Sequence, residues 1–215
     1  TNLEGIKTAS LRATNIVKQL LIFTRITDQK MQPIEIAIVI KDSLKFLRST
    51  IPTSITIEQN ICVTDETILA DPTQINQIMM NLCINASQAM EQTGGNINVK
   101  VEKVILDNHL ANSNPELTPG EYIKVMVSDT GPGIDPNILD RIFDPYFTTK
   151  EIGKGSGMGL SVVHGIVKNH KGIITVDNNP GKGIKFSLLF PLAKEKPLVE
   201  IQTSKELPTG HETIM

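Results

Sequence analysis

Two asparagines four residues apart are the first residues whose spacing suggests chemistry. They lie in the segment Asn81-Leu82-Cys83-Ile84-Asn85-Ala86. Asparagine is a poor helix former, yet the surrounding pattern is helical, so both side chains project from one side of a helix, which Gln77 extends by a turn. A carboxamide oxygen suits Mg²⁺, which takes oxygen ligands. The residues alone also fit a solvated polar stripe on an amphipathic helix.

A carboxylate and two glycines follow an alternating apolar run. The segment is Asp129-Thr130-Gly131-Pro132-Gly133-Ile134. A carboxylate at the end of a strand can accept a hydrogen bond from an exocyclic amine, and glycines let a flat ring approach the backbone. Because Asp, Gly and Pro are also ordinary turn residues, the segment alone indicates either a base-binding turn or a simple one.

Alternating glycines stand directly before a predicted helix. The segment is Gly153-Lys154-Gly155-Ser156-Gly157-Met158-Gly159-Leu160. Backbone N–H groups and the helix dipole make such a place suitable for phosphate, although a flexible loop could have the same composition. The spacing is neither the dinucleotide-binding fingerprint nor the P-loop. A weaker Gly-x-Gly turn, at residues 181–183, indicates only a hairpin.

Helices and strands must position these segments. Apolar residues at three- and four-residue spacing predict helices, and alternation predicts strands. We predict helices over residues 3–27, 35–50, 71–92 and 160–169, and strands over 55–63, 97–101, 122–127, 172–178 and 184–190. The core side of the third helix is expected to contain Ile75, Ile78, Met79, Leu82, Ala86, Ala89 and Met90. The irregular alternation favours an α+β fold, a mixed sheet covered on one face by helices.

The composition excludes several classes of protein. The chain has 215 residues, and its net charge of −2 argues against nucleic-acid binding or a polybasic membrane contact. No apolar run reaches the roughly 18 residues of a membrane-spanning helix, and no signal peptide opens the chain. Cys62 and Cys83 lie in apolar patterns, which favours a reducing compartment and predicts a cytoplasmic location.

The order and spacing of the motifs resemble the nucleotide-binding fold shared by histidine kinases, DNA gyrase, mismatch-repair ATPases and a class of chaperones. The resemblance covers residues 33–192 and implies a two-layer, Bergerat-type (GHKL) ATP-binding domain. The sensor histidine kinases are the most similar branch, because residues 143–150, Phe-Asp-Pro-Tyr-Phe-Thr-Thr-Lys, are similar to their F box. Gyrase-like ATPases place a water-activating glutamate where this chain has Asn81, so the resemblance favours phosphoryl transfer to a protein side chain over hydrolysis.

The resemblance implies a role for each residue of the first two motifs. Asn85 would ligate Mg²⁺, and Asn81 would assist at the metal and the phosphates of ATP. Asp129 would bind the adenine amine, and Gly131 and Gly133 would line the base pocket.

The remaining motifs would handle the phosphates. Residues 135–156 would form a mobile lid anchored by Phe143 and by Phe147, the latter also beside the nucleotide, while Lys150 would contact phosphate and count with the two asparagines as catalytic. The glycine segment would hinge the lid and bind ATP through Gly155, Gly157, Met158, Gly159 and Leu160.

Two departures from the family pattern affect this interpretation. The Gly-x-Gly hairpin is often followed by Thr, near the waters around adenine, but here by Ile184. Many kinases carry a basic residue shortly after the second Asn, whereas Ser87 and Gln88 follow here. Phosphate binding is therefore expected to depend more on the lid.

The phosphoacceptor histidine of the family has no counterpart in this sequence. It lies in a His-Glu-x-x-Asn-Pro-like motif, and none of His109, His164, His170 and His211 has that context. Residues 1–30 resemble the second helix of the dimerisation stalk, and the chain opens without Met, as a fragment would. We expect it to bind ATP without autophosphorylating. The full-length protein would be a homodimer in which the acceptor lies on the stalk helix of the same or the partner protomer.

The end of the chain suggests a further partner. Residues 193–215 are predicted to be a linker, and residues 210–215 resemble the entry to a receiver domain, as in hybrid kinases. A response regulator receiver domain is thus an expected partner. Two alternatives are a hydrolysing ATPase of the same fold and a degenerate module that binds nucleotide or supports a dimer.

Overall fold

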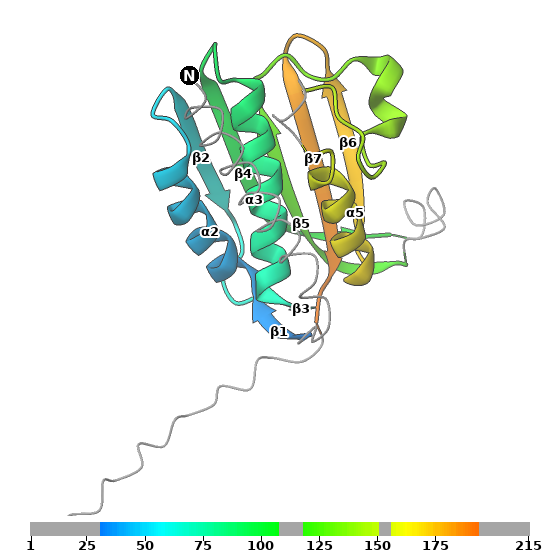
Figure 1. The fold of residues 1–215 in the computed structure, drawn as a ribbon. Coiled ribbons are helices and arrows are strands. Elements are labelled where there is room, and N and C mark those ends of the chain that lie inside the picture. Colours follow the sequence, from blue (N-terminus) through cyan, green and yellow to red (C-terminus); the bar gives the residue numbers. More distant parts are fainter. Residues whose placement is uncertain (1–30, 108–117, 151–155, 194–215) are drawn as a thin grey trace, which may run out of the picture.

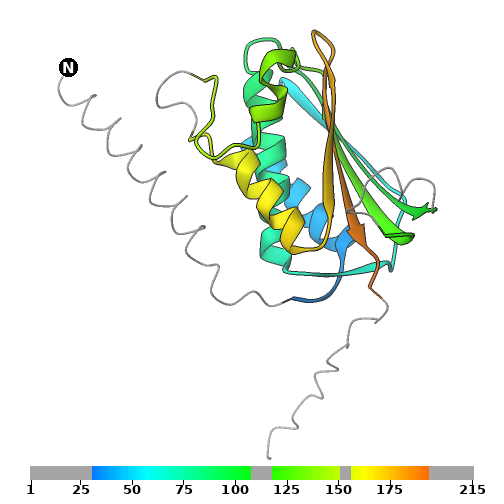
Figure 2. The same cartoon turned by 90° about the vertical axis from the view of Figure 1, so that its right-hand side faces the viewer.

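The described part of the computed structural model, residues 31–107, 118–150 and 156–193, forms two layers. Three helices, α2 (Ile36–Thr50), α3 (Pro72–Ala89) and α5 (Gly159–Asn169), cover one face of a sheet (Figures 1 and 2). This confirms the predicted α+β fold class. Among the described helices, none combines the length and apolar character that a bilayer crossing requires.

The main sheet is mixed, as predicted. Its strands lie in the order β2 (Ile55–Ile61), β4 (Gly95–Leu106), β5 (Gly120–Asp129), β7 (Gly183–Pro191) and β6 (Ile173–Asn179). The β2–β4 pair is parallel, and the other pairs are antiparallel. The predicted hairpin is β6–β7, and β5 ends at Asp129 as expected. Alternate residues of β4, including Ile97, Val99 and Val101, are fully buried, as expected of a sheet packed on one face.

Helix α3 lies between the other two helices and carries the asparagines. It begins after Asp71, whose side chain accepts a hydrogen bond from the Thr73 N–H at 2.8 Å, with Pro72 in the first turn. It ends at Ala89, three residues earlier than predicted. Ala89 is exposed rather than in the core, since the helix is ending there, whereas the other six predicted core residues are buried.

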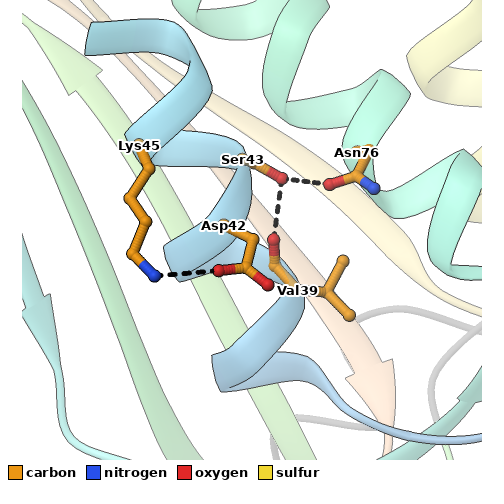
Figure 3. A network of polar contacts seen from close by, with 5 residues as sticks. All are labelled: Val39, Asp42, Ser43, Lys45 and Asn76. Carbon is orange, nitrogen blue, oxygen red and sulfur yellow. Dashed lines mark hydrogen bonds and ion pairs between the residues drawn. The ribbon is translucent and has the colours of Figure 1, made fainter.

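A polar contact joins α2 to α3. The buried Ser43 hydroxyl donates to the Val39 carbonyl at 2.8 Å and contacts the Asn76 carboxamide (Figure 3). The nearby Lys45–Asp42 pair is exposed. The contact therefore satisfies a hydroxyl within the helix layer, as buried polar groups require.

The structure adds elements that the sequence pattern did not predict. A small antiparallel sheet is formed by β1 (Gln32–Glu35) and β3 (Thr67–Ala70), and a 3₁₀ helix, η2, spans Pro136–Arg141. The predicted helix over residues 3–27 and the linker over 193–215 fall outside the described residues, except for residue 193. Cys62 and Cys83 are both free, and burial raises the pKa of Cys83 to about 12.

Candidate active site

The two asparagines of α3 face the beginning of α5. A Cβ atom placed on Gly159, the first residue of α5, would lie 3.2 Å from Asn81 Oδ1 and 3.6 Å from Asn85 Nδ2. The glycine therefore lets the helix start approach both carboxamides. Two motifs far apart in the sequence are thus brought together, and the free N–H groups of the α5 start lie beside them.

Lys150 completes this end of the site. Its Nζ lies 3.3 Å from Asn85 Oδ1 and also contacts Gln88 Oε1. Burial lowers the pKa of Lys150 because it removes water from the ammonium. Asn85 Oδ1, which is predicted to bind Mg²⁺, therefore contacts the Lys150 ammonium in this structure.

The residues fit Mg²⁺ held together with a phosphate ligand. Within the described residues, no cluster of three or more His, Cys, Asp or Glu side chains could hold a metal alone. Mg²⁺ commonly takes few protein oxygens and completes its shell with phosphate and water. The Asn85 oxygen, which already accepts from an ammonium, suits such a shell.

Asp129 lies at the other end of the site, where β5 ends. Its Oδ1 accepts a hydrogen bond from the Gly131 N–H at 2.9 Å. Desolvation raises the pKa of Asp129, while the N–H groups of Gly131 and Ile184 oppose that rise. Ile184 stands where the family often has Thr, so the Thr hydroxyl is absent here. The Ile184 backbone N–H still donates a hydrogen bond to the Asp129 carboxylate.

Gly131 connects this turn to α3. A Cβ atom on Gly131 would lie 3.2 Å from Met90 Cγ and 3.6 Å from Ala89 Cβ, just beyond Asn85 along the helix. Thr130 fixes the turn to β4, since its N–H donates to Asn96 O at 3.1 Å and its Oγ1 accepts from Asn96 N at 3.0 Å. Both ends of the site are therefore arranged along α3.

The β6–β7 hairpin supports the Asp129 turn from behind. A Cβ atom on Gly183, where φ is +109°, would lie 1.9 Å from Asp129 O. Gly133, at φ +73°, packs on the hairpin tip, and Gly181 N donates to Pro132 O at 2.7 Å. The glycines here are required by backbone conformation and by close approach.

The segment predicted to form the lid contacts α5 through one pair of aromatic rings. Phe143 stacks on His164 with centroids 5.3 Å apart, and the Arg141 guanidinium lies 4.5 Å from the Phe147 ring centre. Phe143 also packs against the core, which agrees with its predicted anchoring role.

Tyr146 lies between Phe143 and Phe147 in the sequence. It adopts φ +66°, which is uncommon for a residue other than glycine. A Cβ atom on Gly157 would lie 2.4 Å from the Tyr146 carbonyl carbon, so the two backbones are in contact there.

The other glycine-segment residues are placed at the start of α5. Met158 precedes the first turn and its carbonyl accepts from Ser161 Oγ at 2.9 Å, while Leu160 packs against the core. Gly155 lies outside the described residues. Leu160 is therefore placed by packing, and Met158 marks the point where α5 begins.

An open depression of about 620 Å³ flanks the site. It is lined by Gln88, Ala89, Glu91, Gln92, Thr93, Gly94, Thr130, Gly131, Pro132 and Gly181. Neither Asn85 nor Asp129 lines it, and its lining comes from residues 88–89 and 91–94, the turn at residues 130–132 and Gly181. The side-chain geometry, not this depression, defines the site.

His170 holds the far ends of α3 and α5 together. Its Nδ1 donates to Ile166 O at 2.7 Å and its Nε2 accepts from Asp71 N at 3.2 Å, so the ring is neutral. Desolvation lowers the pKa of this buried ring, although its contact with Ile166 and the charge of Asp71 act in the opposite direction. The role of the ring is therefore structural.

Sequence reasoning missed two residues of the site. Gln88 was noted only for lacking charge, yet it contacts Lys150; its place one turn after the second asparagine was the available signal. Asn178 was correctly predicted to lie in a strand, but the hydrogen bonds between its carboxamide and Ile134 were not predicted. No local pattern marks that contact, because the two residues are 44 positions apart.

Known proteins are similar to this chain in sequence and in fold. Residues 70–194 match the family described as histidine kinase-, DNA gyrase B-, and HSP90-like ATPase. Sensor kinase CckA of Brucella abortus (strain 2308) is 34% identical over 193 residues, which cover 89% of this chain and 20% of CckA. This chain therefore spans only a small part of that relative.

Solved structures agree in fold. The catalytic domain of histidine kinase ThkA, in a nucleotide-free form, is 26% identical with a TM-score of 0.59, and the match covers 75% of this chain and 95% of that domain. Full-length ShkA in complex with AMPPNP shares the fold at 24% identity and a TM-score of 0.66, covering 85% of this chain and 36% of ShkA. Because the family match spans more than half of the chain, this chain belongs to the histidine kinase-, DNA gyrase B-, and HSP90-like ATPases, and its fold is that of a histidine kinase catalytic domain.

Proposed function

We propose that this chain is the ATP-binding catalytic unit of a sensor histidine kinase, which transfers the γ-phosphoryl group of Mg·ATP to a histidine on a dimerisation stalk. The observation that carries the proposal is the approach of Asn81 and Asn85 to the start of α5, with Lys150 on Asn85 Oδ1. The C-terminal half of α3 thus offers oxygen donors beside the backbone N–H groups of the α5 start and the Lys150 ammonium, while the Asp129 turn lies at the C-terminal end of α3. The AMPPNP complex of ShkA supports the same ligand class.

The residues would divide the work along the nucleotide. Asp129 accepts a hydrogen bond from the adenine amine, with Gly131 and Gly133 against the ring. Asn85 would hold the metal through its carboxamide oxygen, with Asn81 beside it. When bound, Mg²⁺ supplies positive charge against the phosphate oxygens. Lys150 leaves Asn85 and contacts phosphate.

The protein's contribution to the reaction would be positioning and electrostatics. The bond from the γ-phosphorus to its bridging oxygen breaks, its electron pair stays on ADP, and a new bond forms to an imidazole nitrogen. The N–H groups at the start of α5 stabilise charge on the oxygens, and little covalent chemistry falls to this unit. Lid residues over the phosphates would exclude water and limit hydrolysis.

The whole protein's partners are part of the proposal. Residues 1–30 would supply the second stalk helix, and residues 193–215 a linker. The full-length kinase would be a homodimer whose catalytic unit is cytoplasmic and which passes the phosphoryl group to a receiver domain. Histidine kinase ThkA, which shares the fold, has been solved in complex with the response regulator protein TrrA.

Calorimetric titration with AMPPNP, with and without Mg²⁺, tests the proposal. We expect one-to-one binding that Asp129→Ala abolishes and that Asn85→Ala makes insensitive to Mg²⁺. Asp177→Ala, which removes an exposed carboxylate of β6, is the matched control and should bind normally. If the folded wild-type chain does not bind, the chain is a degenerate module; if it releases phosphate rapidly from ATP without an acceptor, it is a hydrolysing ATPase.

A further inference from the structure

Asn178, on β6, both accepts a hydrogen bond from and donates one to the backbone of Ile134, the residue just before the predicted lid. Its Oδ1 accepts from the Ile134 N–H at 2.9 Å, and its Nδ2 donates to the Ile134 carbonyl at 2.7 Å. A carboxamide can both donate and accept, so it pairs with Ile134 as a neighbouring strand would. The side chain is partly buried between the hairpin and the turn.

The other contacts between hairpin and turn come from the backbone or depend on a glycine. Gly181 N donates to Pro132 O at 2.7 Å. A Cβ atom on Gly133 would lie 3.0 Å from Asn178 Oδ1 and from Asn179 O. Among these contacts, Asn178 supplies a side chain, so its two hydrogen bonds can be removed by substitution without replacing a residue of the turn itself.

The position of Ile134 gives this bond its importance. It directly follows Gly133 of the base turn and lies two residues before Pro136, where η2 begins. Because Asn178 bonds to both the N–H and the carbonyl of Ile134, the segment from Asp129 to Ile134 is restrained up to the point where the predicted lid begins. A turn held in place before the ligand arrives binds more tightly, since less ordering remains to be done.

We infer that Asn178 is a positioning residue for the adenine-binding turn. Its carboxamide holds Gly133 and Ile134 in the conformation in which Asp129 and the two glycines receive a purine base. The inference deepens the proposed function and rests on it. The phosphate end, which Asn178 does not contact, does not depend on this residue.

The test separates base binding from phosphate binding. Asn178→Leu keeps the approximate size and removes both hydrogen bonds, while Asn178→Asp keeps the acceptor but turns a second acceptor toward the Ile134 carbonyl. Asn179→Leu, at the exposed neighbouring position, is the control. Calorimetry with Mg·AMPPNP and with Mg·tripolyphosphate gives the two affinities, and circular dichroism and thermal melting verify folding.

We expect Asn178→Leu to weaken AMPPNP binding about tenfold, as the loss of two net hydrogen bonds would, with Asn178→Asp weakened at least as much. Tripolyphosphate affinity should change less than twofold, and Asn179→Leu should match wild type. Folded variants of Asn178 that bind AMPPNP as wild type does, or that lose both ligands equally, would overturn the inference. If Leu prevents folding, the Asp variant carries the same comparison. Absence of AMPPNP binding by wild type would instead overturn the proposed function itself.

Discussion

The two ends of the site are held in different ways. At the base end, Asp129 and its turn are fixed by backbone contacts: Gly183 against Asp129 O, Gly181 to Pro132, and Ile184 N–H to the carboxylate. At the phosphate end, Lys150 reaches Asn85 and Gln88 through a flexible side chain. The base end is thus held by main-chain contacts before nucleotide arrives, while we expect the side-chain contacts of the phosphate end to exchange when nucleotide binds.

The largest effect should come from breaking the fixed end. Gly183→Ala would place a Cβ atom onto Asp129 O, and we expect it to lower the free energy of unfolding by more than about 3 kcal/mol. Gly181→Ala is the matched control, since φ is also positive, at +79°, but no atom lies within 4 Å of the added carbon. That variant should lose only about 1 kcal/mol. Urea denaturation measures both, and equal losses would mean that close packing on Asp129 is unimportant.

Asp129→Asn should separate nucleotide binding from stability. We expect AMPPNP affinity to fall about 10- to 100-fold, because a hydrogen bond to a charged group is lost. Burial raises the pKa of Asp129, so its ionised form is disfavoured in the folded chain. The stability from this group is present below its unfolded pKa and is lost as pH rises through the raised folded pKa.

Neutralising Asp129 therefore relieves a penalty at pH 7 while losing an acceptor. We expect these effects to offset, which leaves the free energy of unfolding within about 1 kcal/mol of wild type. Thermal melts with and without nucleotide test this, with Asp177→Asn as the exposed control. A large loss of stability in the Asp129 variant would make the carboxylate structural.

The sequence was sufficient for those parts that depend on local pattern. The end of β5 at Asp129, the beginning of α3 after Asp71 and the α5 start at Gly159 all have their signals within a few residues. Strands β1 and β3 were missed because four residues each cannot display a period of two. Their pairing with each other, Gln32 with Ala70 and onward, is visible only in three dimensions.

The site was predictable to the extent that its residues sit in motifs. Asn81, Asn85, Asp129 and the glycines were predicted as candidate site residues from their type and spacing, and their roles stay predictions. The contact between Asn178 and Ile134 depends on the tertiary approach of a hairpin to a turn, and the placement of Lys150 on Gln88 depends on how a lid packs on a helix. Neither leaves a mark in hydrophobic periodicity.

Lys150 and Gln88 test whether the phosphate end exchanges its contacts. Because the Lys150 ammonium contacts Asn85 Oδ1 without nucleotide, it competes with Mg²⁺ for that oxygen. Gln88→Ala removes one partner of Lys150, so we expect Mg·AMPPNP affinity to rise about two- to fivefold, in line with one modest hydrogen bond. Lys150→Met loses the phosphate contact as well, so its affinity should fall.

Calorimetry over a series of Mg²⁺ concentrations measures both variants. Gln92→Ala, exposed one turn further along the chain, is the control. Equal affinities for wild type and the Gln88 variant at every Mg²⁺ concentration would show that Lys150 is not restrained, and the two ends of the site would then differ less than the contacts suggest.

The effect of pH concerns the ends of α3 and α5 that lie away from the site. Desolvation lowers the pKa of His170, whose neutral Nε2 accepts from Asp71 N. Because the unfolded chain binds the proton more readily, stability is complete above the unfolded pKa of about 6.5 and falls with pH below it, until the lowered folded pKa is reached. The free energy of unfolding should therefore decrease between pH 7 and pH 5.

His170→Leu should remove this pH dependence and cost about 1–3 kcal/mol at pH 7, since the Asp71 N–H is left without its partner. His164→Gln, on the same helix against Phe143, should keep the slope. Denaturant titrations at several pH values measure both variants. If the free energy of unfolding of His170→Leu still falls between pH 7 and pH 5, the titration belongs to another group. The contact of His170 with Asp71 would then not explain the pH dependence.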